Sequence, residues 1–143
     1  MKLDTLLICD DIRQEVGGKQ SLMGLYNDAI IFEASPEGLP AWPKLMKLGF
    51  FIRLSFTEDD KIQEGTAFSF SFRRGDEAVE IARGLFAVQG PAHSRFASLS
   101  IMANPFVING PGEMVFSLLL LDAQGRAFKT FAGAGSIRIE QRQ

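Results

Sequence analysis

Few side chains in this sequence could act as nucleophiles or bases. His93 is the only histidine and Cys9 the only cysteine. A Ser-His-Asp or Cys-His arrangement would therefore have to include His93, which lies in residues 90–94 and is expected in an exposed loop. Cys9 lies in an apolar run typical of a buried strand, and no serine occupies a G-x-S-x-G motif. We expect a protein that is not an enzyme, and a hydrolase that uses His93 is the less favoured alternative.

Two acidic clusters could bind a cation. Asp10 and Asp11 follow the first apolar run, and Asp59 and Asp60 follow Glu58. A calcium site requires several oxygen ligands that converge from different loops, and solvated turn residues are the commoner explanation for such clusters. We therefore expect no metal ion and no other cofactor. The alternative function is a small-ligand or calcium- and lipid-binding C2-like domain that carries these four aspartates in its loops.

Three further features resemble functional motifs. Gly17-Gly18-Lys19 lacks the upstream glycine and the following Ser or Thr of a phosphate-binding P-loop. Arg74-Gly75-Asp76 spells an integrin-recognition tripeptide, but its position between two alternating runs favours a hairpin turn. Trp42 and Tyr26 are the side chains best equipped to line a ligand pocket. Both are interpreted as residues at the edge of the core.

The elements that must position these side chains are strands. Apolar and polar residues alternate through 48–56 and again through 66–73, where phenylalanine alternates with serine. A period of two is typical of a strand with one buried face, and Gly-, Asn- and Asp-rich turns separate the runs. Residues 132–135 are almost without side chains, which predicts a bulge or bend. Strands are predicted at 3–12, 20–33, 45–57, 66–74, 79–88, 97–104, 113–122 and 126–140.

This pattern predicts an all-β protein. The expected architecture is an antiparallel two-layer β-sandwich, immunoglobulin-like or C2-like, with about eight strands. The length of 143 residues fits a single domain over residues 1–143. Thirteen phenylalanines against one tyrosine and one tryptophan indicate a dry core, because phenylalanine has no polar group. A short helix around residues 58–63 is the one helical element considered.

Charge and apolar content limit the expected partners and location. The net charge is −2 and no basic run occurs, which argues against nucleic acid. A single cysteine is typical of the reducing cytoplasm. The first apolar stretch is too short for a signal peptide, and residues 115–121 are too few to cross a bilayer. We expect a soluble cytoplasmic protein with no membrane span.

Two of the predicted strands carry apolar side chains on the face that should be solvated. Val115, Leu119 and Leu121 lie there in one strand, and Phe51 in another. Cover by loops or by a neighbouring strand is one explanation. A subunit interface is the other, since large exposed apolar patches are uncommon on soluble monomers. These four residues form a possible interface, which predicts a homo-oligomer or a complex with a protein partner.

Three segments resemble a family of small bacterial proteins of unknown function. The opening M-K-L-D and the apolar strand into Asp10 look like the start of that family. Residues 18–26 are similar to its G-K-x-[SN]-L-x-G-x-[YF] turn and strand. Residues 111–116 resemble its P-G-x-Y-x-F motif, with Met114 where an aromatic residue is usual. The resemblance spans most of the chain in order and implies a β-sandwich. It implies no activity, catalytic residue or cofactor.

Overall fold

The computed structural model describes residues 1–34, 37–38, 42–86 and 95–142. The regular elements within these ranges are all β-strands, which confirms the all-β class. The region 58–63, considered for a short helix, contains turns instead. The strands are β1 (Lys2–Gln14), β2 (Gln20–Tyr26), β3 (Ala29–Glu33), β4 (Lys44–Ser55), β5 (Ala67–Arg74), β6 (Glu77–Leu85), β7 (Phe96–Ile108), β8 (Gly112–Leu121) and β9 (Ala127–Arg142).

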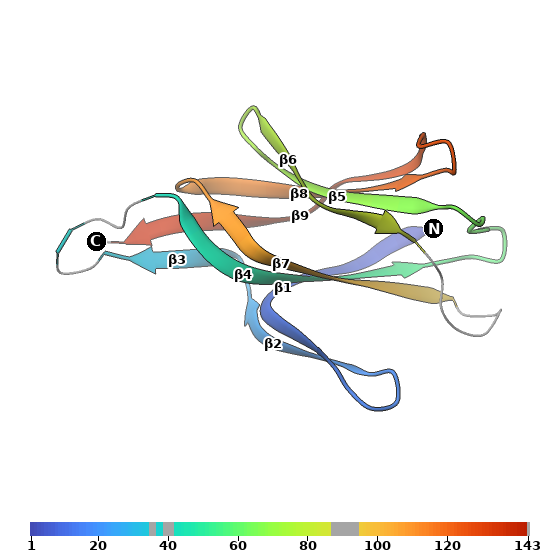
Figure 1. Cartoon of the computed structure of the whole chain (residues 1–143), viewed down its shortest axis with the longest axis horizontal. Coiled ribbons are helices and arrows are strands. Elements are labelled where there is room, and N and C mark those ends of the chain that lie inside the picture. Colours follow the sequence, from blue (N-terminus) through green and yellow to red (C-terminus); the bar gives the residue numbers. More distant parts are fainter. Residues whose placement is uncertain (35–36, 39–41, 87–94, 143) are drawn as a thin grey trace.

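The nine strands form two sheets (Figure 1). The four-stranded sheet has the order β2-β1-β4-β7, and the five-stranded sheet has the order β3-β9-β8-β5-β6. The five-stranded sheet curls into a half-barrel, so the arrangement departs from two flat layers. Pairing is antiparallel except between β3 and β9, which run parallel. The prediction of a wholly antiparallel fold is therefore wrong for β3.

The predicted strand 20–33 is two strands that belong to different sheets. Its first part, β2, pairs with β1, and its second part, β3, pairs with β9. The chain changes sheets at Asn27 and Asp28. The carbonyl oxygen of Asp28 accepts a hydrogen bond from the backbone N–H of Arg138 at 2.9 Å, which attaches the crossing point to β9. Alternation of apolar residues continues across the crossing, so the break leaves little trace in the sequence.

Phenylalanine rings join the two sheets. The ring of Phe50 in β4 lies 5.1 Å from that of Phe70 in β5 and 5.3 Å from that of Phe116 in β8, centroid to centroid. All three side chains are fully buried. Tilted and edge-to-face arrangements at these distances are the geometry that aromatic rings favour. The core cluster between the sheets therefore contains the phenylalanine stripes that the alternation indicates.

The predicted irregularity at residues 132–135 is confirmed as a bulge in β9. Phe116 pairs with Gly135, whereas Leu118 pairs with Phe131, so β9 carries two extra residues between these pairs. A side chain at Gly135 would place its Cβ 2.5 Å from Cδ2 of Leu6 in β1. The absence of a side chain therefore allows β1 and β9 to approach each other, and this contact joins the two sheets along one side.

The turn interpretation of Arg74-Gly75-Asp76 is also confirmed. The tripeptide connects β5 to β6, and Gly75 has a φ of 57°, a conformation that glycine adopts without steric cost. The Arg74 side chain does not extend into solvent for recognition by a partner. Its Nη1 donates a hydrogen bond to the carbonyl oxygen of Gly110 at 2.8 Å.

Candidate functional site

The strand register aligns four residues in a row across the four-stranded sheet. Leu25 pairs with Cys9, Cys9 with Gly49, and Gly49 with Met102. The neighbouring position in β4, Phe50, points into the core, and side chains of adjacent residues in a strand point to opposite faces. This row therefore lies on the outer face of the sheet, away from the core.

A second uncharged row lies beside the first. Phe51 pairs with Leu7 on one side and with Ser100 on the other. The two rows together define what we call the apolar band: Leu7, Cys9, Leu25, Gly49, Phe51, Ser100 and Met102. Leu25 is 52% exposed and Met102 is 39% exposed. Further exposed apolar side chains lie around the band on the same strands, at Met23, Leu45, Phe96 and Val107.

Gly49 lies at the centre of the band and allows its neighbours to close over β4. A Cβ at this position would lie 3.0 Å from Sγ of Cys9, 3.0 Å from Cγ1 of Ile12 and 3.0 Å from Sδ of Met102. These side chains occupy the space above the glycine. Cys9 is fully buried as a result, although it lies on the outer face.

The burial of Cys9 also determines its chemistry. Its Sγ donates to the carbonyl oxygens of Asp11 at 3.4 Å and of Gly49 at 3.7 Å. Burial raises the pKa of the thiol, so the thiolate needed for nucleophilic attack is disfavoured. The expectation of a buried thiol at this position is confirmed.

Charged side chains lie on both sides of the apolar band. On one side, Nζ of Lys47 lies 2.9 Å from Oδ1 of Asp11, and this hydrogen bond lowers the pKa of the Asp11 carboxyl. On the other side, the guanidinium of Arg53 lies over the ring of Phe96, 3.9 Å from its centroid. An uncharged centre within a charged margin is the usual anatomy of a protein interface.

The four residues predicted as a possible interface do not lie together. Phe51 is half-buried within the apolar band on the four-stranded sheet. Val115 and Leu119 are half-buried in β8, which belongs to the other sheet. Leu121 is only 6% exposed and belongs to the buried residues. Of the four, only Phe51 lies in the apolar band.

Polar neighbours separate Val115 from Leu119 on the outer face of the five-stranded sheet. Arg73 pairs with Val115, and Ser69 pairs with Leu119. The Ser69 hydroxyl donates to a carboxylate oxygen of Glu80 at 2.7 Å. These two apolar side chains are therefore single residues among polar ones, which is ordinary for a protein surface.

The two predicted acidic pairs, residues 10–11 and 59–60, lie near opposite ends of β1. Lys2 of β1 pairs with Ser55 just before one acidic pair, whereas Cys9 pairs with Gly49 next to the other. At about 3.3 Å per residue, this separation is on the order of 20 Å, too far for a shared cation. Among the described residues, no three His, Cys, Asp or Glu side chains are grouped closely enough to hold a metal ion.

Tyr26 and Trp42 lie at the edge of the core, as expected. Both are partly buried and pack against the core cluster. The Trp42 indole Nε1 donates to Oε1 of Gln141 at 3.2 Å, and its ring packs edge-on against Phe32. His93, the residue on which the hydrolase alternative depends, lies outside the described residues.

Tyr26 provides a pH-dependent test of this geometry. Burial, followed by the hydrogen bond from its hydroxyl to Oδ1 of Asp10, raises the pKa of Tyr26 to about 12. The neutral phenol is thus favoured in the folded state. Its contribution to stability is complete below the ordinary tyrosine pKa of about 10 and is lost as the pH rises through 12.

Phenolate absorbance measures this pKa directly, because Tyr26 is the only tyrosine. We expect the midpoint near pH 12 in the wild type and a lower midpoint in Asp10→Asn, which removes the carboxylate acceptor. Circular dichroism along the same titration verifies that the chain remains folded. A wild-type midpoint at the ordinary value, in a folded chain, would show that Tyr26 is solvated and that the Asp10 contact does not form.

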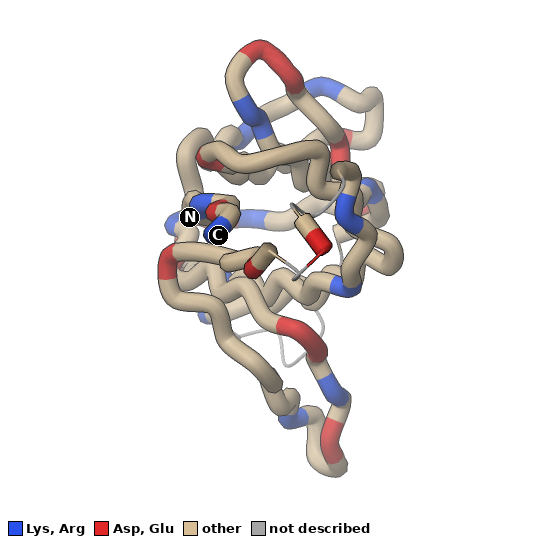
Figure 2. The backbone as a smooth tube through the Cα atoms, turned by 90° about the vertical axis from the view of Figure 1, so that its left-hand side faces the viewer, with Lys and Arg blue, Asp and Glu red and all other residues tan. Residues whose placement is uncertain are grey.

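Comparison with known proteins does not assign the chain. Neither protein-family models nor curated proteins match its sequence. In the part of the chain that the structure describes, no helix has the length and apolar character needed to span a membrane. In the view of Figure 2, basic and acidic residues alternate along the backbone rather than separating into regions of one sign. The fold and the apolar band therefore define the class: an all-β protein with an uncharged band across the outer face of one sheet.

Proposed function

We propose that the chain is a non-enzymatic β-sandwich module, immunoglobulin-like or C2-like in general shape, that associates with a second copy of itself through the apolar band. The row of Leu25, Cys9, Gly49 and Met102 carries the proposal. It crosses all four strands without a charged side chain, and both of its ends are exposed. Cys9 and Gly49, between these ends, are buried, and Leu25 and Met102 are the exposed members of the row.

A second copy is the partner that suits this face best. A twofold interface brings the same patch of two subunits together, so the patch must tolerate its own charges. The centre of the band has none, and its margin carries both signs, with Asp11 next to Lys47 and Arg53 on the opposite side. Two copies can therefore face each other without a like-charge pair at the centre.

Leu25→Asp tests the proposal by sedimentation velocity. We expect the wild type to sediment as a dimer of the 15.8 kDa chain. Leu25→Asp should convert it to a monomer, because the interface would bury an unpaired carboxylate at one end of the row. Leu25 is in an edge strand and half exposed in the single chain, so the substitution should leave the fold intact.

Phe128→Asp is the matched control. Phe128 is 48% exposed, close to the 52% of Leu25, but it lies in β9 of the other sheet. We expect this variant to remain a dimer. A monomeric wild type, or a Leu25→Asp variant that dimerises as well as Phe128→Asp, would refute self-association through the band.

A further inference from the structure

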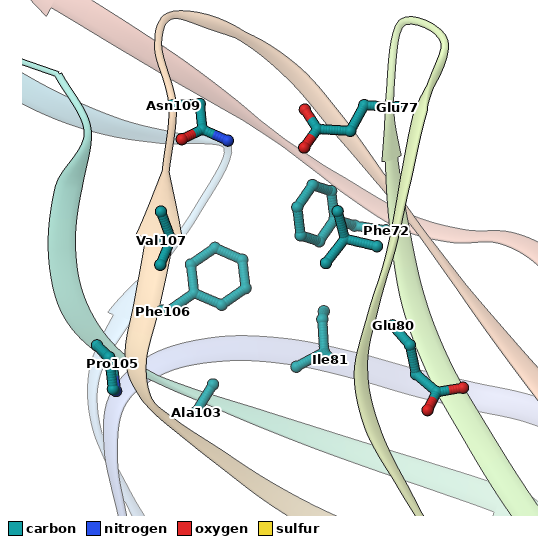
Figure 3. Close-up of a pocket in the computed structure, with 10 residues that line it drawn as sticks. Phe72, Glu77, Glu80, Ile81, Ala103, Pro105, Phe106, Val107 and Asn109 are labelled. Carbon is teal, nitrogen blue, oxygen red and sulfur yellow. The ribbon is translucent and has the colours of Figure 1, made fainter.

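A cavity of about 260 Å³ opens between the two sheets, at a distance from the centre of the apolar band (Figure 3). It lies between β6 and β7, the edge strands of the two sheets, which are not paired with each other. Its walls are therefore side chains from both sheets. The residues that line it are Phe72, Glu77, Val79, Glu80, Ile81, Ala103, Pro105, Phe106, Val107 and Asn109.

The interior of the cavity is apolar and suits a flat ring. Phe72 and Phe106 are almost fully buried, and their ring centroids lie 5.6 Å apart. Ile81 and Ala103 point into the same space (Figure 3). A cavity of about 150 Å³ lined by apolar side chains is large enough to bind benzene. The volume here therefore accommodates one aromatic ring and a short chain attached to it.

One end of the cavity is acidic. The side chains of Glu77 and Asn109 face each other across it (Figure 3). The lining contains two carboxylates and no lysine or arginine. Glu80 points away from the cavity, and its oxygens accept hydrogen bonds from Ser69 and Arg83.

Glu77 is the carboxylate that remains available at this end. Its register partner Arg74 donates instead to the carbonyl oxygen of Gly110, the residue that follows Asn109, at 2.8 Å. Within the described part of the chain, no ion pair to Glu77 occurs. A ligand that carries a positive charge at one end would therefore find an acceptor there.

We propose that this cavity is a binding site for a small arylalkylamine. The aromatic ring packs against Phe72 and Phe106, and the protonated amine lies at the acidic end, where it donates hydrogen bonds to Glu77 and to the Asn109 amide oxygen. Small-molecule sites of this kind combine an apolar wall with a few polar groups that orient the ligand. Val107 lines the cavity and also lies beside the apolar band, but none of the seven residues of the band lines the cavity.

The test is a two-dimensional amide NMR titration with three probes of matched shape. 2-Phenylethylamine is cationic, n-propylbenzene is neutral and 3-phenylpropionate is anionic. We expect saturable shifts for residues of β6 and β7 with the amine, weaker binding of the neutral probe and no binding of the anion. The Leu25→Asp variant should behave identically, so the outcome is independent of self-association.

The Glu77→Gln variant tests how much the negative charge of Glu77, at the acidic end of the cavity, contributes to binding. We expect this variant to bind the amine about three- to five-fold more weakly, the loss typical of one exposed ion pair, and to bind propylbenzene unchanged. Glu113→Gln, an exposed glutamate in β8 that does not line the cavity, is the control and should bind like the wild type. Absence of saturable shifts in β6 and β7 with the amine, or equal binding of amine and anion, would overturn the proposal.

Discussion

Replacing Phe116 by alanine is expected to lower the free energy of unfolding by about 3–5 kcal/mol. Phe116 is fully buried in β8, and its ring packs against Phe50 of the opposite sheet and against Phe70 and Phe72 of the neighbouring strand. Alanine would leave a cavity where the two sheets meet. Because rings from both sheets surround that cavity, the core can close around it only in part.

Denaturant unfolding followed by the fluorescence of Trp42, the only tryptophan, measures this loss. Phe128→Ala is the control, since Phe128 is about half exposed and should cost about 0.5 kcal/mol or less. A loss for Phe116→Ala no larger than that of the control would mean that the phenylalanine rings do not hold the two sheets together.

Gly135→Val is expected to destabilise the fold by about 1–3 kcal/mol through overpacking. A Cβ at this position would lie 2.5 Å from Cδ2 of Leu6, so the Leu6 side chain or one of the two strands must move. Valine adds two further methyl groups in the same direction. The contact joins β1 of the four-stranded sheet to β9 of the five-stranded sheet.

Leu6→Ala should partly rescue Gly135→Val, because it removes the atoms that clash. In a double-mutant cycle we expect the combined loss in unfolding free energy to be smaller than the sum of the two single losses. Ala132→Val, at an exposed position of the same bulge, should have little effect. Strict additivity of Leu6→Ala and Gly135→Val would show that the two residues are not in contact.

Much of the fold could be predicted because the alternation of apolar and polar residues, and the residues typical of turns, can be recognised within short segments of the sequence. The stripe of Phe68, Phe70 and Phe72 required only a period of two, and the turn at Gly75 required only a glycine between two runs. The bulge at residues 132–135 was visible as a lack of side chains. The crossing between β2 and β3 was not, because both halves keep the same alternation while pairing with different sheets.

The candidate site depends on pairings between strands that are distant in the chain. Leu25, Cys9, Gly49 and Met102 form one row only through three separate strand pairs. Phe51 interrupts the alternation of apolar and polar residues in its own strand, so it could be identified from the sequence. Met102 follows its strand's alternation as an ordinary outward residue, so its significance appears only beside its neighbours.

Val115 and Leu119 of β8 lie outside the apolar band for a related reason. Val115 and Leu119 also break an alternation, but their partners across the sheet are polar. An apolar residue on an outer face forms part of a patch only when the adjacent strands supply apolar neighbours. The cavity between β6 and β7 could not be predicted from the sequence either. Its walls come from the edge strands of two different sheets, and local sequence patterns do not show which edge strands lie side by side.

Protection of the methionine methyl groups from a soluble paramagnetic agent tests self-association through the apolar band most directly. In the single chain Met23 is 41% exposed and Met102 is 39% exposed, whereas Met114 is 2% exposed. We expect the Met23 and Met102 methyl signals to be broadened less in the wild type than in Leu25→Asp, while Met114 is protected in both. Equal broadening of Met23 and Met102 in the two proteins would show that the outer face of the four-stranded sheet is uncovered, which would contradict the proposed interface.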